Sequence, residues 1–539
     1  MSNPFLSLLF PSEEKRAAHA TQAGRATVSN AVCDEIGLSL LLDLHGSALS
    51  EYFTADEEVI RYREAAIADM IALPRLGETL AEALPILRDV TELRQLDSEL
   101  GASSGESYLY SITEIELYVG VIDVLFKGLS DVRTELKSKA FTELCRFVTE
   151  LVESDYYREL NDRLRQLSAR MREVRSITVG VNLDSAMRPV EAGVVSVNSE
   201  PFKSGKVLDK ILRMSFRNDA MTCIAALSPF GKGQSENRRD ALLSAFNSAI
   251  EEVFRSSVRS WRSIVGEYVL ENTDFLLRLL PEIEFITKAT ALELRLTERG
   301  CALATPILRP IEEKALDAKA LYNPDVALRI KDEIITNDFT FDDNARLYVL
   351  TGPNRGGKSV ITCAVGLAQA MVQLGLRAPA AACTISPVNA IFTHFPEGAD
   401  DTIDKGRLGE ECARLRDIFD QIDEHSMILL DESLSSTGSY EASYIGEEIL
   451  CGFAIARCRG IFSTHLHELA AALPEVNRRA AKEGGVAIDT LVAGIEEGRR
   501  SFRIHRTTPD GKSYARDIAN KYGLSLEEIT GRLKAGKEY

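Results

Sequence analysis

The spacing of apolar residues divides the chain into a long helical region and a later region of short buried strands. From residue 30 to about 330, apolar side chains recur every three or four positions, which predicts amphipathic helices. Residues 177–202 depart from this period, because β-branched residues alternate or cluster there, and they predict a small hairpin or sheet. After residue 330, apolar runs typical of buried parallel strands predict an α/β domain. The clearest helical runs lie at 40–44, 60–70 and 242–253, and the strand-like runs at 347–351, 425–430 and 460–465.

The first strand-like run leads into a glycine-rich sequence that is typical of phosphate binding. Residues 352–359 have the pattern GxxxxGKS and lie between an apolar strand and a predicted helix. The glycines let successive backbone N–H groups face an anion, and the helix begins with its positive dipole end beneath them. Lys358 is expected to reach the β- and γ-phosphates, and the Ser359 hydroxyl to ligate Mg²⁺. The predicted nucleotide-binding residues of this segment are Gly352, Pro353, Asn354, Arg355, Gly356, Gly357, Lys358, Ser359 and Val360.

Two further strands end in side chains that suit hydrolysis. Asp431 and Glu432 follow the run 425–430, and ligand sites in open α/β sheets lie at the carboxyl ends of strands. Asp431 is expected to hold the Mg²⁺ shell, and Glu432 is the candidate base for the attacking water. An apolar strand followed by Asp-Glu is commonplace, so only its pairing with the phosphate loop indicates a hydrolytic site. His465 is expected to contact the γ-phosphate or the water, whereas His467 is interpreted as a polar cap.

Four segments together resemble the ATPase domain of the MutS family of DNA mismatch-repair proteins: TGPNRGGKS, GLRAPAAACTISPVNAIFTHF, LLDES followed by SSTGSYEA, and FSTHLHEL. Their order and spacing agree over residues 334–470, and Asn337 falls where the family has an asparagine ahead of the phosphate loop. Residues 52–76 are similar to the start of the family's helical core, and residues 511–525 to its C-terminal helix-turn-helix. The resemblance implies a dimeric ATPase that uses ATP and Mg²⁺ and closes around a nucleic acid.

The resemblance implies a multidomain chain: a mostly helical lever region with a small β insertion, an α/β P-loop ATPase domain and a C-terminal helix-turn-helix. An apolar face in the last part is expected to be buried between two subunits; it comprises Tyr514, Ile518, Ala519, Tyr522 and Leu524. The expected divisions are an N-terminal segment at 1–29, the helical core at 30–330 with a reduced clamp at about 177–217, the ATPase domain at 331–500 and the dimerisation segment at 501–539.

Three departures from the family pattern indicate a divergent branch. Ile334 occupies the position where gapless counting places the aromatic residue that stacks on adenine. The loop at 404–411 contains no hydroxyl residue, although in the family it presents a serine to the partner subunit's γ-phosphate. Lys405, Arg407 or backbone N–H groups are the alternatives for that contact. The stretch 434–438 retains a threonine but lacks the family's arginine.

The N-terminal part of the sequence bears on what the protein recognises. Mismatch-sensing members of the family have two globular domains ahead of the helical core, one of which carries an aromatic wedge, whereas this chain reaches core-like sequence by about residue 30. No Smr-type nuclease tail is expected after the helix-turn-helix. These features favour recognition of structured or branched DNA over mismatches. Two alternatives remain: an ATPase that acts on ribosomes or structured RNA, and a regulatory scaffold that binds ATP but hydrolyses it little.

Composition adds limits to this interpretation. The chain has 539 residues, of which 45% are hydrophobic. This length and composition predict a soluble protein with several domains. No stretch reaches the roughly twenty apolar residues of a membrane span, and no secretory leader is evident. Nine cysteines without CxxC spacing indicate reduced core residues in a cytoplasmic protein.

The net charge of −18 argues against a broad nucleic-acid-binding surface but leaves room for a local basic groove. Arginines recur over residues 158–175, and lysines and arginines over residues 203–217. A solvated helix face with compensating acids is the favoured interpretation of these clusters, and nucleic-acid contact through Arg165, Arg172 and Lys206 is the alternative.

Overall fold

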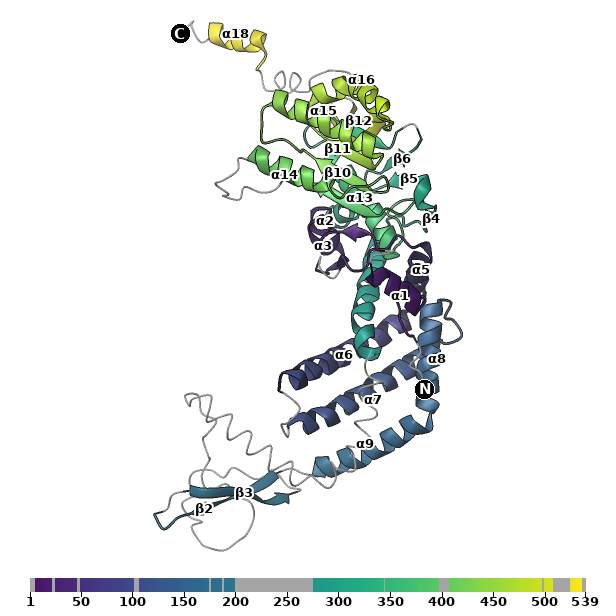
Figure 1. The fold of residues 1–539 in the computed structure, drawn as a ribbon, viewed down its shortest axis with the longest axis vertical. Coiled ribbons are helices and arrows are strands. Elements are labelled where there is room, and N and C mark those ends of the chain that lie inside the picture. Colours follow the sequence, from purple (N-terminus) through teal and green to yellow (C-terminus); the bar gives the residue numbers. More distant parts are fainter. Residues whose placement is uncertain are drawn as a thin grey trace. The chain divides into compact units, whose positions relative to one another are not determined.

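The computed structural model describes residues 5–21, 25–45, 49–100, 106–173, 176–186, 189–198, 275–343, 345–396, 407–496, 499–507 and 524–535 (Figure 1). The chain forms two compact units, and each is described by itself. Unit 1 contains Met1–Ser7 and Leu73–Glu284, and unit 2 contains Leu8–Ala72 and Phe285–Tyr539.

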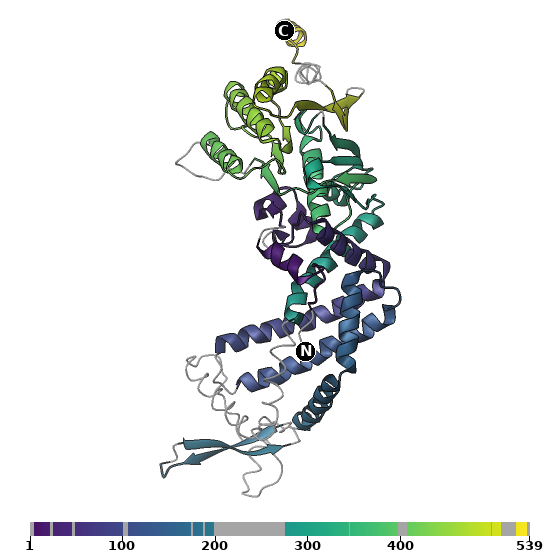
Figure 2. The same cartoon turned by 45° about the vertical axis from the view of Figure 1, so that its right-hand side comes forward.

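Unit 1 is helical, with a β-hairpin at the end of its last described long helix. Helices α6 and α7 lie side by side (Figures 1 and 2), and a Cβ added to Gly128 would meet Thr79 Oγ1 at 1.9 Å, so the glycine permits their close approach. The Ser138 hydroxyl caps α8 by accepting a hydrogen bond from Phe141 N. The elements are α6 (Pro74–Leu100), α7 (Glu106–Val132), α8 (Lys139–Glu153), α9 (Asp155–Glu173), β2 (Ser176–Leu183) and β3 (Pro189–Asn198).

The antiparallel pairing of β2 and β3 confirms the hairpin predicted from the change in period. The predicted helix at 60–70 is also confirmed, by α5 in unit 2. The remainder of the expected clamp and the helical run at 242–253 lie outside the described residues.

Unit 2 is built around a seven-stranded sheet with the order β1-β9-β10-β11-β7-β12-β13. All neighbours are parallel except β12 and β13, which form an antiparallel hairpin. The strands are β1 (Thr27–Val28), β7 (Leu347–Thr351), β9 (Ala390–His394), β10 (Met427–Asp431), β11 (Arg459–Ser463), β12 (Ile488–Glu496) and β13 (Arg499–Arg506). The helices that follow these strands are α13 (Lys358–Leu374), α14 (Arg407–Phe419), α15 (Ser439–Ala456) and α16 (His467–Lys482).

Both faces of this sheet are covered, which explains why its strands read as continuous apolar runs. Ile428, Leu430 and Phe462 pack with residues of α14, α15 and α16 in one core cluster. Leu429 points to the opposite face, because a Cβ added to Gly366 of α13 would meet Leu429 Cδ1 at 2.5 Å. The phosphate-loop helix α13 therefore packs on the face of the sheet opposite to α14, α15 and α16, against the strands that carry the site.

A smaller four-stranded sheet has the order β4-β8-β5-β6; three of its strands precede β7 in the chain, and β8 follows α13. It occupies part of the region up to residue 330 that was expected to be helical, because Leu316–Leu321 alternates between buried and exposed residues at the period of a strand. Its elements are β4 (Ile307–Leu308), η1 (Ile311–Glu313), β5 (Leu316–Leu321), α12 (Pro324–Arg329), β6 (Asn337–Phe341) and β8 (Ala382–Ile385). Residues 285–298 are helical.

The N-terminal residues of unit 2 are part of its core. β1 adds an edge strand to the large sheet by pairing with β9. Arg63 is fully buried, and its guanidinium donates to Leu9 O at 3.1 Å and lies 5.1 Å from the Phe10 ring centroid. The expected divisions at residues 30 and 331 thus differ from the two units, because these contacts join residues far apart in sequence. The helices are α1 (Glu13–Ala20), α2 (Asn30–Glu35), α3 (Leu38–Leu42) and α5 (Glu57–Ala72).

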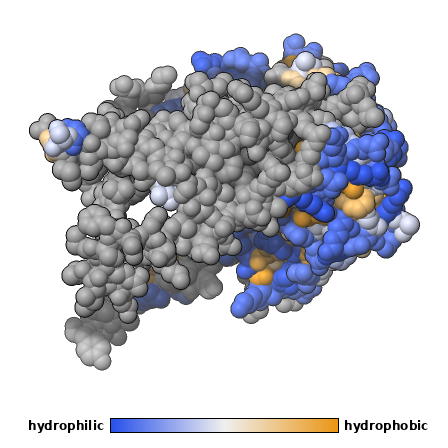
Figure 3. All heavy atoms as spheres, turned by 90° about the horizontal axis from the view of Figure 1, so that it is seen from below, coloured by the Kyte–Doolittle hydropathy of each residue, from blue (hydrophilic) through white to orange (hydrophobic). Residues whose placement is uncertain are grey.

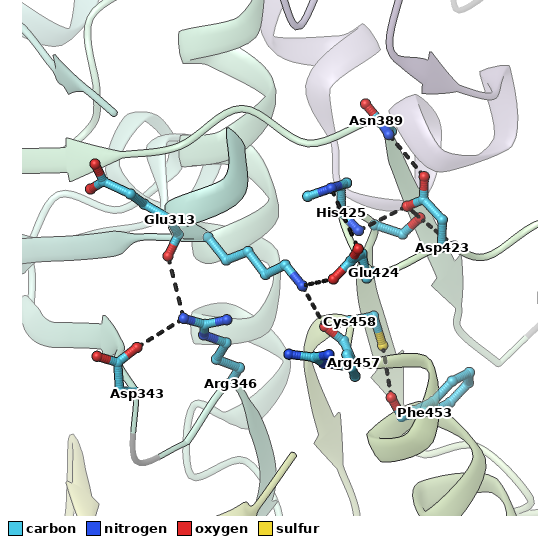
Figure 4. A network of polar contacts seen from close by, with 12 residues as sticks. Glu313, Asp343, Arg346, Asn389, Asp423, Glu424, His425, Phe453, Arg457 and Cys458 are labelled. Carbon is cyan, nitrogen blue, oxygen red and sulfur yellow. Dashed lines mark hydrogen bonds and ion pairs between the residues drawn. The ribbon is translucent and has the colours of Figure 1, made fainter. Parts of the chain in front are cut away.

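A polar network closes the sheet edge where β10 and β11 begin (Figure 4). Lys314 is buried, and its ammonium donates to Glu424 at 2.7 Å and to Arg457 O at 3.4 Å. Asp423 accepts from Asn389 Nδ2 at 2.8 Å. These bonds fix the strand ends that lie farthest from Asp431 and Ser463.

Several expectations concern features of the whole chain. No helix among the described residues is long and apolar enough to cross a membrane. The eight described cysteines are free. On the face shown in Figure 3, the described surface is mainly hydrophilic, with separate hydrophobic spots.

Of the predicted dimerisation segment, α18 (Leu526–Ala535) is described and Leu524 is 60% exposed. Tyr514, Ile518, Ala519 and Tyr522 lie outside the described residues.

Candidate nucleotide-binding and hydrolytic site

Three adjacent strands end where the sequence places its candidate chemistry. β10, β11 and β7 are parallel neighbours, so their carboxyl ends lie at one edge of the sheet. β10 ends in Asp431 and continues into Glu432, β11 leads to His465, and β7 leads into the glycine-rich loop. The fold therefore brings these three sequence elements together.

The glycine-rich loop depends on glycine at specific positions. Gly352 has φ 139°, and an added Cβ would meet Ala493 Cβ at 2.7 Å. Gly357 has φ 93° and directly precedes α13. A Cβ on Gly356 would meet Pro353 O at 2.8 Å. Larger residues would thus be strained or would clash, and the loop could not curl over the helix N-terminus.

Lys358 is the buried cation of this edge, with 4% of its surface exposed. Its ammonium donates to Gly352 O and Pro353 O, both at 3.2 Å, and lies 3.4 Å from His465 Nδ1. Burial lowers the pKa of Lys358, while the negative charges of Glu432 and Asp431 act in the opposite direction. The ammonium is therefore held against the loop, where an anion on the loop N–H groups would meet it.

The residues predicted to hold Mg²⁺ fit an ion bound mainly through phosphates and water. Asp431 is 7% exposed, and its Oδ1 has no hydrogen-bond partner among the described residues. Ser359 is exposed in the first turn of α13. No group of three or more metal-ligating side chains occurs in the described part of the chain, and Mg²⁺ with a nucleotide needs only one or two protein oxygens.

The side chains of Glu432 and His465 form a hydrogen-bonded pair. Glu432 Oε1 lies 2.7 Å from His465 Nε2, and both side chains are partly exposed, at 41% and 36%. Glu432 has φ 48°, which is unusual for a residue with a side chain. This arrangement orients a carboxylate next to Lys358. His467 is exposed as the first residue of α16; the N-cap position is Leu466 and no side chain caps the helix, so the interpretation of His467 as a cap is wrong.

A cavity of about 500 Å³ opens beside the loop and is lined by residues from Arg355 to Ile361, by Glu432 and by the segment 330–337. Ile334 lines it, and so do two aromatic residues, Tyr322 and Phe502. Phe502 is 44% exposed and has φ 56°, and its Cδ1 would lie 3.5 Å from a Cβ on Gly357. Sequence reasoning missed Phe502, because its backbone turn within β13 leaves no trace in the hydrophobic pattern.

Asn337 lies at this cavity, but its amide bonds to the neighbouring strand. Asn337 Nδ2 donates to Phe502 O at 3.2 Å, and its Oδ1 accepts from Ile504 N at 2.7 Å. These bonds hold the irregular part of β13 that presents the Phe502 ring. In the described structure Asn337 thus positions a cavity residue.

The remaining candidates are distributed as follows. Asn354 and Arg355 are exposed at the loop tip, and Val360 O accepts from Asn323 Nδ2 at 3.2 Å. Arg165 is exposed on α9. The side chains of Arg172 and Arg407 and all of Lys206 and Lys405 lie outside the described residues.

The glycine-rich loop, buried lysine and strand-end carboxylates are typical of α/β proteins that bind a nucleotide at a sheet edge. Two family models match the chain: MutS domain V over residues 348–520, and the MutS2 N-terminal domain over residues 55–299. The chain belongs to the MutS family, whose members are ATPases.

Similar proteins carry names from DNA mismatch repair. Probable DNA mismatch repair protein Msh6 of Drosophila melanogaster is 40% identical over 127 residues, which are 23% of this chain and 10% of that protein. DNA mismatch repair protein MutS of Prochlorococcus marinus is 33% identical over 219 residues, which are 38% of this chain and 22% of that protein. The MutS of Fervidobacterium nodosum is 28% identical over 219 residues, which are 38% of this chain and 24% of that protein. The match thus spans a quarter or less of each relative.

Proposed function

We propose that this chain binds ATP with Mg²⁺ at the sheet edge and hydrolyses it to ADP and phosphate. The observation that carries the proposal is the juxtaposition of Lys358, the Glu432–His465 pair and the buried Asp431 oxygen beside the glycine loop. A phosphate-binding loop alone would support nucleotide binding. The adjacent carboxylates add groups that can hold Mg²⁺ and accept a proton from water.

The residues divide the reaction between charge stabilisation and proton transfer. The loop N–H groups and Lys358 stabilise the negative charge of the β- and γ-phosphates. Ser359 and Asp431 would hold Mg²⁺, which neutralises phosphate charge when bound. Glu432 accepts a proton from the water whose oxygen attacks the γ-phosphorus, and the bond from that phosphorus to the β-phosphate oxygen breaks. His465 orients Glu432 through a hydrogen bond and lies near Lys358. From this position His465 can contact the γ-phosphate and sense whether it is present.

The cavity beside the loop suits the base and ribose. Its volume of about 500 Å³ falls in the range of small-molecule pockets, and its lining is largely apolar. Ile334 stands where the family has an aromatic residue that stacks on adenine. Phe502, on the same cavity, offers an aromatic ring that can take over this role. We therefore assign adenine to the space between these two side chains.

The hydrolytic cycle would operate in a dimer on DNA, and structured or branched DNA is the proposed ligand. The relatives' names support a link to DNA mismatch repair. The exposed Arg165 on α9 suits contact with phosphates, which fix position but carry no base information. Partner proteins of a repair pathway are also expected. A scaffold with little hydrolysis is the second candidate, because the segment 404–411 lacks a hydroxyl residue.

The test is phosphate release by the purified full chain, with Mg²⁺ and with EDTA, alone and with matched duplex, four-way-junction DNA or ribosomes. We expect Mg²⁺-dependent turnover that junction DNA changes most. Lys358→Ala should weaken ATP binding itself, because it removes the buried cation. Tight ATP binding without turnover would favour the scaffold, and stimulation by ribosomes alone would replace DNA as the ligand.

A further inference from the structure

The turn after Asp431 has an unusual backbone. Glu432 has φ 48° and Leu434 has φ 64°, so two residues with side chains adopt left-handed conformations within three positions. Such conformations persist only where surrounding contacts enforce them. Because Glu432 is the proposed base, the contacts that enforce this turn also set the position of its carboxylate.

Three anchors hold the turn, and each comes from a different element. Glu432 N donates to Ser463 O of β11 at 2.9 Å. The Ser433 hydroxyl donates to His394 O of β9 at 2.9 Å and lies 2.7 Å from His394 Nδ1. Leu434 N donates to Glu411 Oε2 of α14 at 2.5 Å.

The third anchor differs from the other two because it comes from a helix. β9 and β11 are parts of the sheet itself, whereas α14 lies outside the sheet. Leu434 is 1% exposed, so its backbone N–H has no access to water and requires a partner inside the protein. The Glu411 carboxylate supplies that partner, and a charged acceptor makes a strong hydrogen bond.

α14 is itself tied to distant parts of unit 2. The Arg414 guanidinium donates to Phe395 O and to Glu35 Oε1 of α2, both at 3.3 Å. Leu415 of α14 packs in the core cluster with strand β10. Residues up to 54, which include Glu35, lie outside both family matches. A displacement of α14 would therefore be transmitted through Glu411 to the turn and resisted through Arg414.

We propose that Glu411 is a positioning residue for ATP hydrolysis: its carboxylate couples helix α14 to the left-handed turn that carries Glu432. The inference rests on the proposed function. Lys358 and Ser359 belong to a different element, α13, so this bond does not hold the residues proposed to bind the phosphates. Glu411 thus acts on the chemical step by fixing the turn that carries Glu432.

The test compares Glu411→Ala with Glu411→Gln, whose amide oxygen can still accept the hydrogen bond from Leu434. Asp417→Ala is the matched control, because it removes an exposed carboxylate from the same helix. Glu411→Ala should lower kcat by about tenfold to a hundredfold, the scale of a displaced catalytic group, with KM for ATP within about twofold of the parent. Glu411→Gln should retain most of the parent kcat, and Asp417→Ala all of it. Thermal unfolding of each variant reports whether it is folded.

Two further measurements separate positioning from general damage. In a Glu432→Gln background, Glu411→Ala should cause little additional loss, because the base that it positions is already absent. Hydrogen–deuterium exchange should rise in peptides covering residues 431–437 of Glu411→Ala and stay unchanged in peptides covering residues 352–360. The exchange result does not depend on ATPase activity.

An unchanged kcat for folded Glu411→Ala, a full additional loss in the Glu432→Gln background, or unchanged exchange at residues 431–437 would each overturn the assignment. A Gln variant as impaired as the Ala variant would also overturn it, since the acceptor oxygen would then not be what matters. If the parent protein shows no turnover above Glu432→Gln, the proposed function fails, and the exchange measurement alone then decides the role of Glu411 in holding the turn.

Discussion

Replacing Phe502 with alanine is expected to separate binding of the base from binding of the phosphates. The ring lines the cavity beside the glycine loop, and the loop holds the phosphates through Lys358 and its N–H groups. The two subsites are built by different strands, β13 and β7. Loss of the ring should therefore weaken ATP while leaving phosphate binding as it was.

The size of the effect follows from the exposure of the ring. Stacking of a base on an aromatic side chain contributes roughly 1–3 kcal/mol by alanine substitution. Phe502 is 44% exposed and lines the cavity, while part of its ring lies near Gly357, so only part of the ring area is available to a base. We take the lower half of that range, about 1–2 kcal/mol, which corresponds to roughly a 5- to 30-fold higher Kd for ATP.

Stability should respond differently from affinity. Phe502 has φ 56°, which costs a residue with a side chain about 1–2 kcal/mol and costs glycine almost nothing. Phe502→Gly loses the contacts of the ring but relieves this strain, so its melting temperature should lie close to that of the parent. Its affinity for ATP should fall as far as that of Phe502→Ala.

The assay is competition against a fluorescent nucleotide, with ATP and with inorganic tripolyphosphate as separate competitors. Phe502→Ala should shift the ATP curve and leave the tripolyphosphate curve in place, with kcat at saturating ATP little changed. Tyr440→Ala is the control, since this aromatic residue is 86% exposed and does not line the cavity. Equal losses for ATP and tripolyphosphate, or no loss for ATP, would refute the assignment of the base subsite.

Two predictions concern assembly and DNA. Truncation at about residue 505 should convert a dimer to monomers in light scattering, because the apolar face expected beyond that point would be removed; a dimer that survives truncation would contradict this. Affinity for four-way-junction DNA should exceed that for matched or singly mismatched duplex and should fall steeply with salt, because phosphate contacts release counterions. Charge reversal at Arg165, Arg172 and Lys206 should weaken binding to all sequences alike. A strong preference for a single mismatch, or the absence of DNA binding at low salt, would contradict that account.

The parts of the site that the sequence revealed are those with local signals. The loop at 352–359 and the strands before Asp431 and His465 follow from short runs whose residue types suit one conformation each. Parallel strands then bring their carboxyl ends to one edge, so the meeting of these groups also follows from the pattern.

The parts that the sequence did not reveal depend on contacts between distant residues or on backbone geometry. β1 has only two residues and is a strand because it pairs with β9, more than 350 residues later. The left-handed φ of Phe502 turns its ring into the cavity, and no composition rule selects an aromatic residue for that conformation. Glu411 belongs to a segment predicted as a loop, but residues 407–411 are helical, and its bond to Leu434 N follows only from the placement of α14.

A single turnover with excess enzyme tests most directly whether Glu432 accepts the proton of the attacking water. Radiolabelled ATP is mixed with the parent or with Glu432→Gln in Mg²⁺, and the bound nucleotide is separated into ATP and ADP over time. We expect both proteins to bind ATP with similar affinity, and the glutamine variant to convert it at least about a hundredfold more slowly, the scale of lost general-base catalysis. Conversion of bound ATP to ADP at the parent rate in Glu432→Gln would contradict the account.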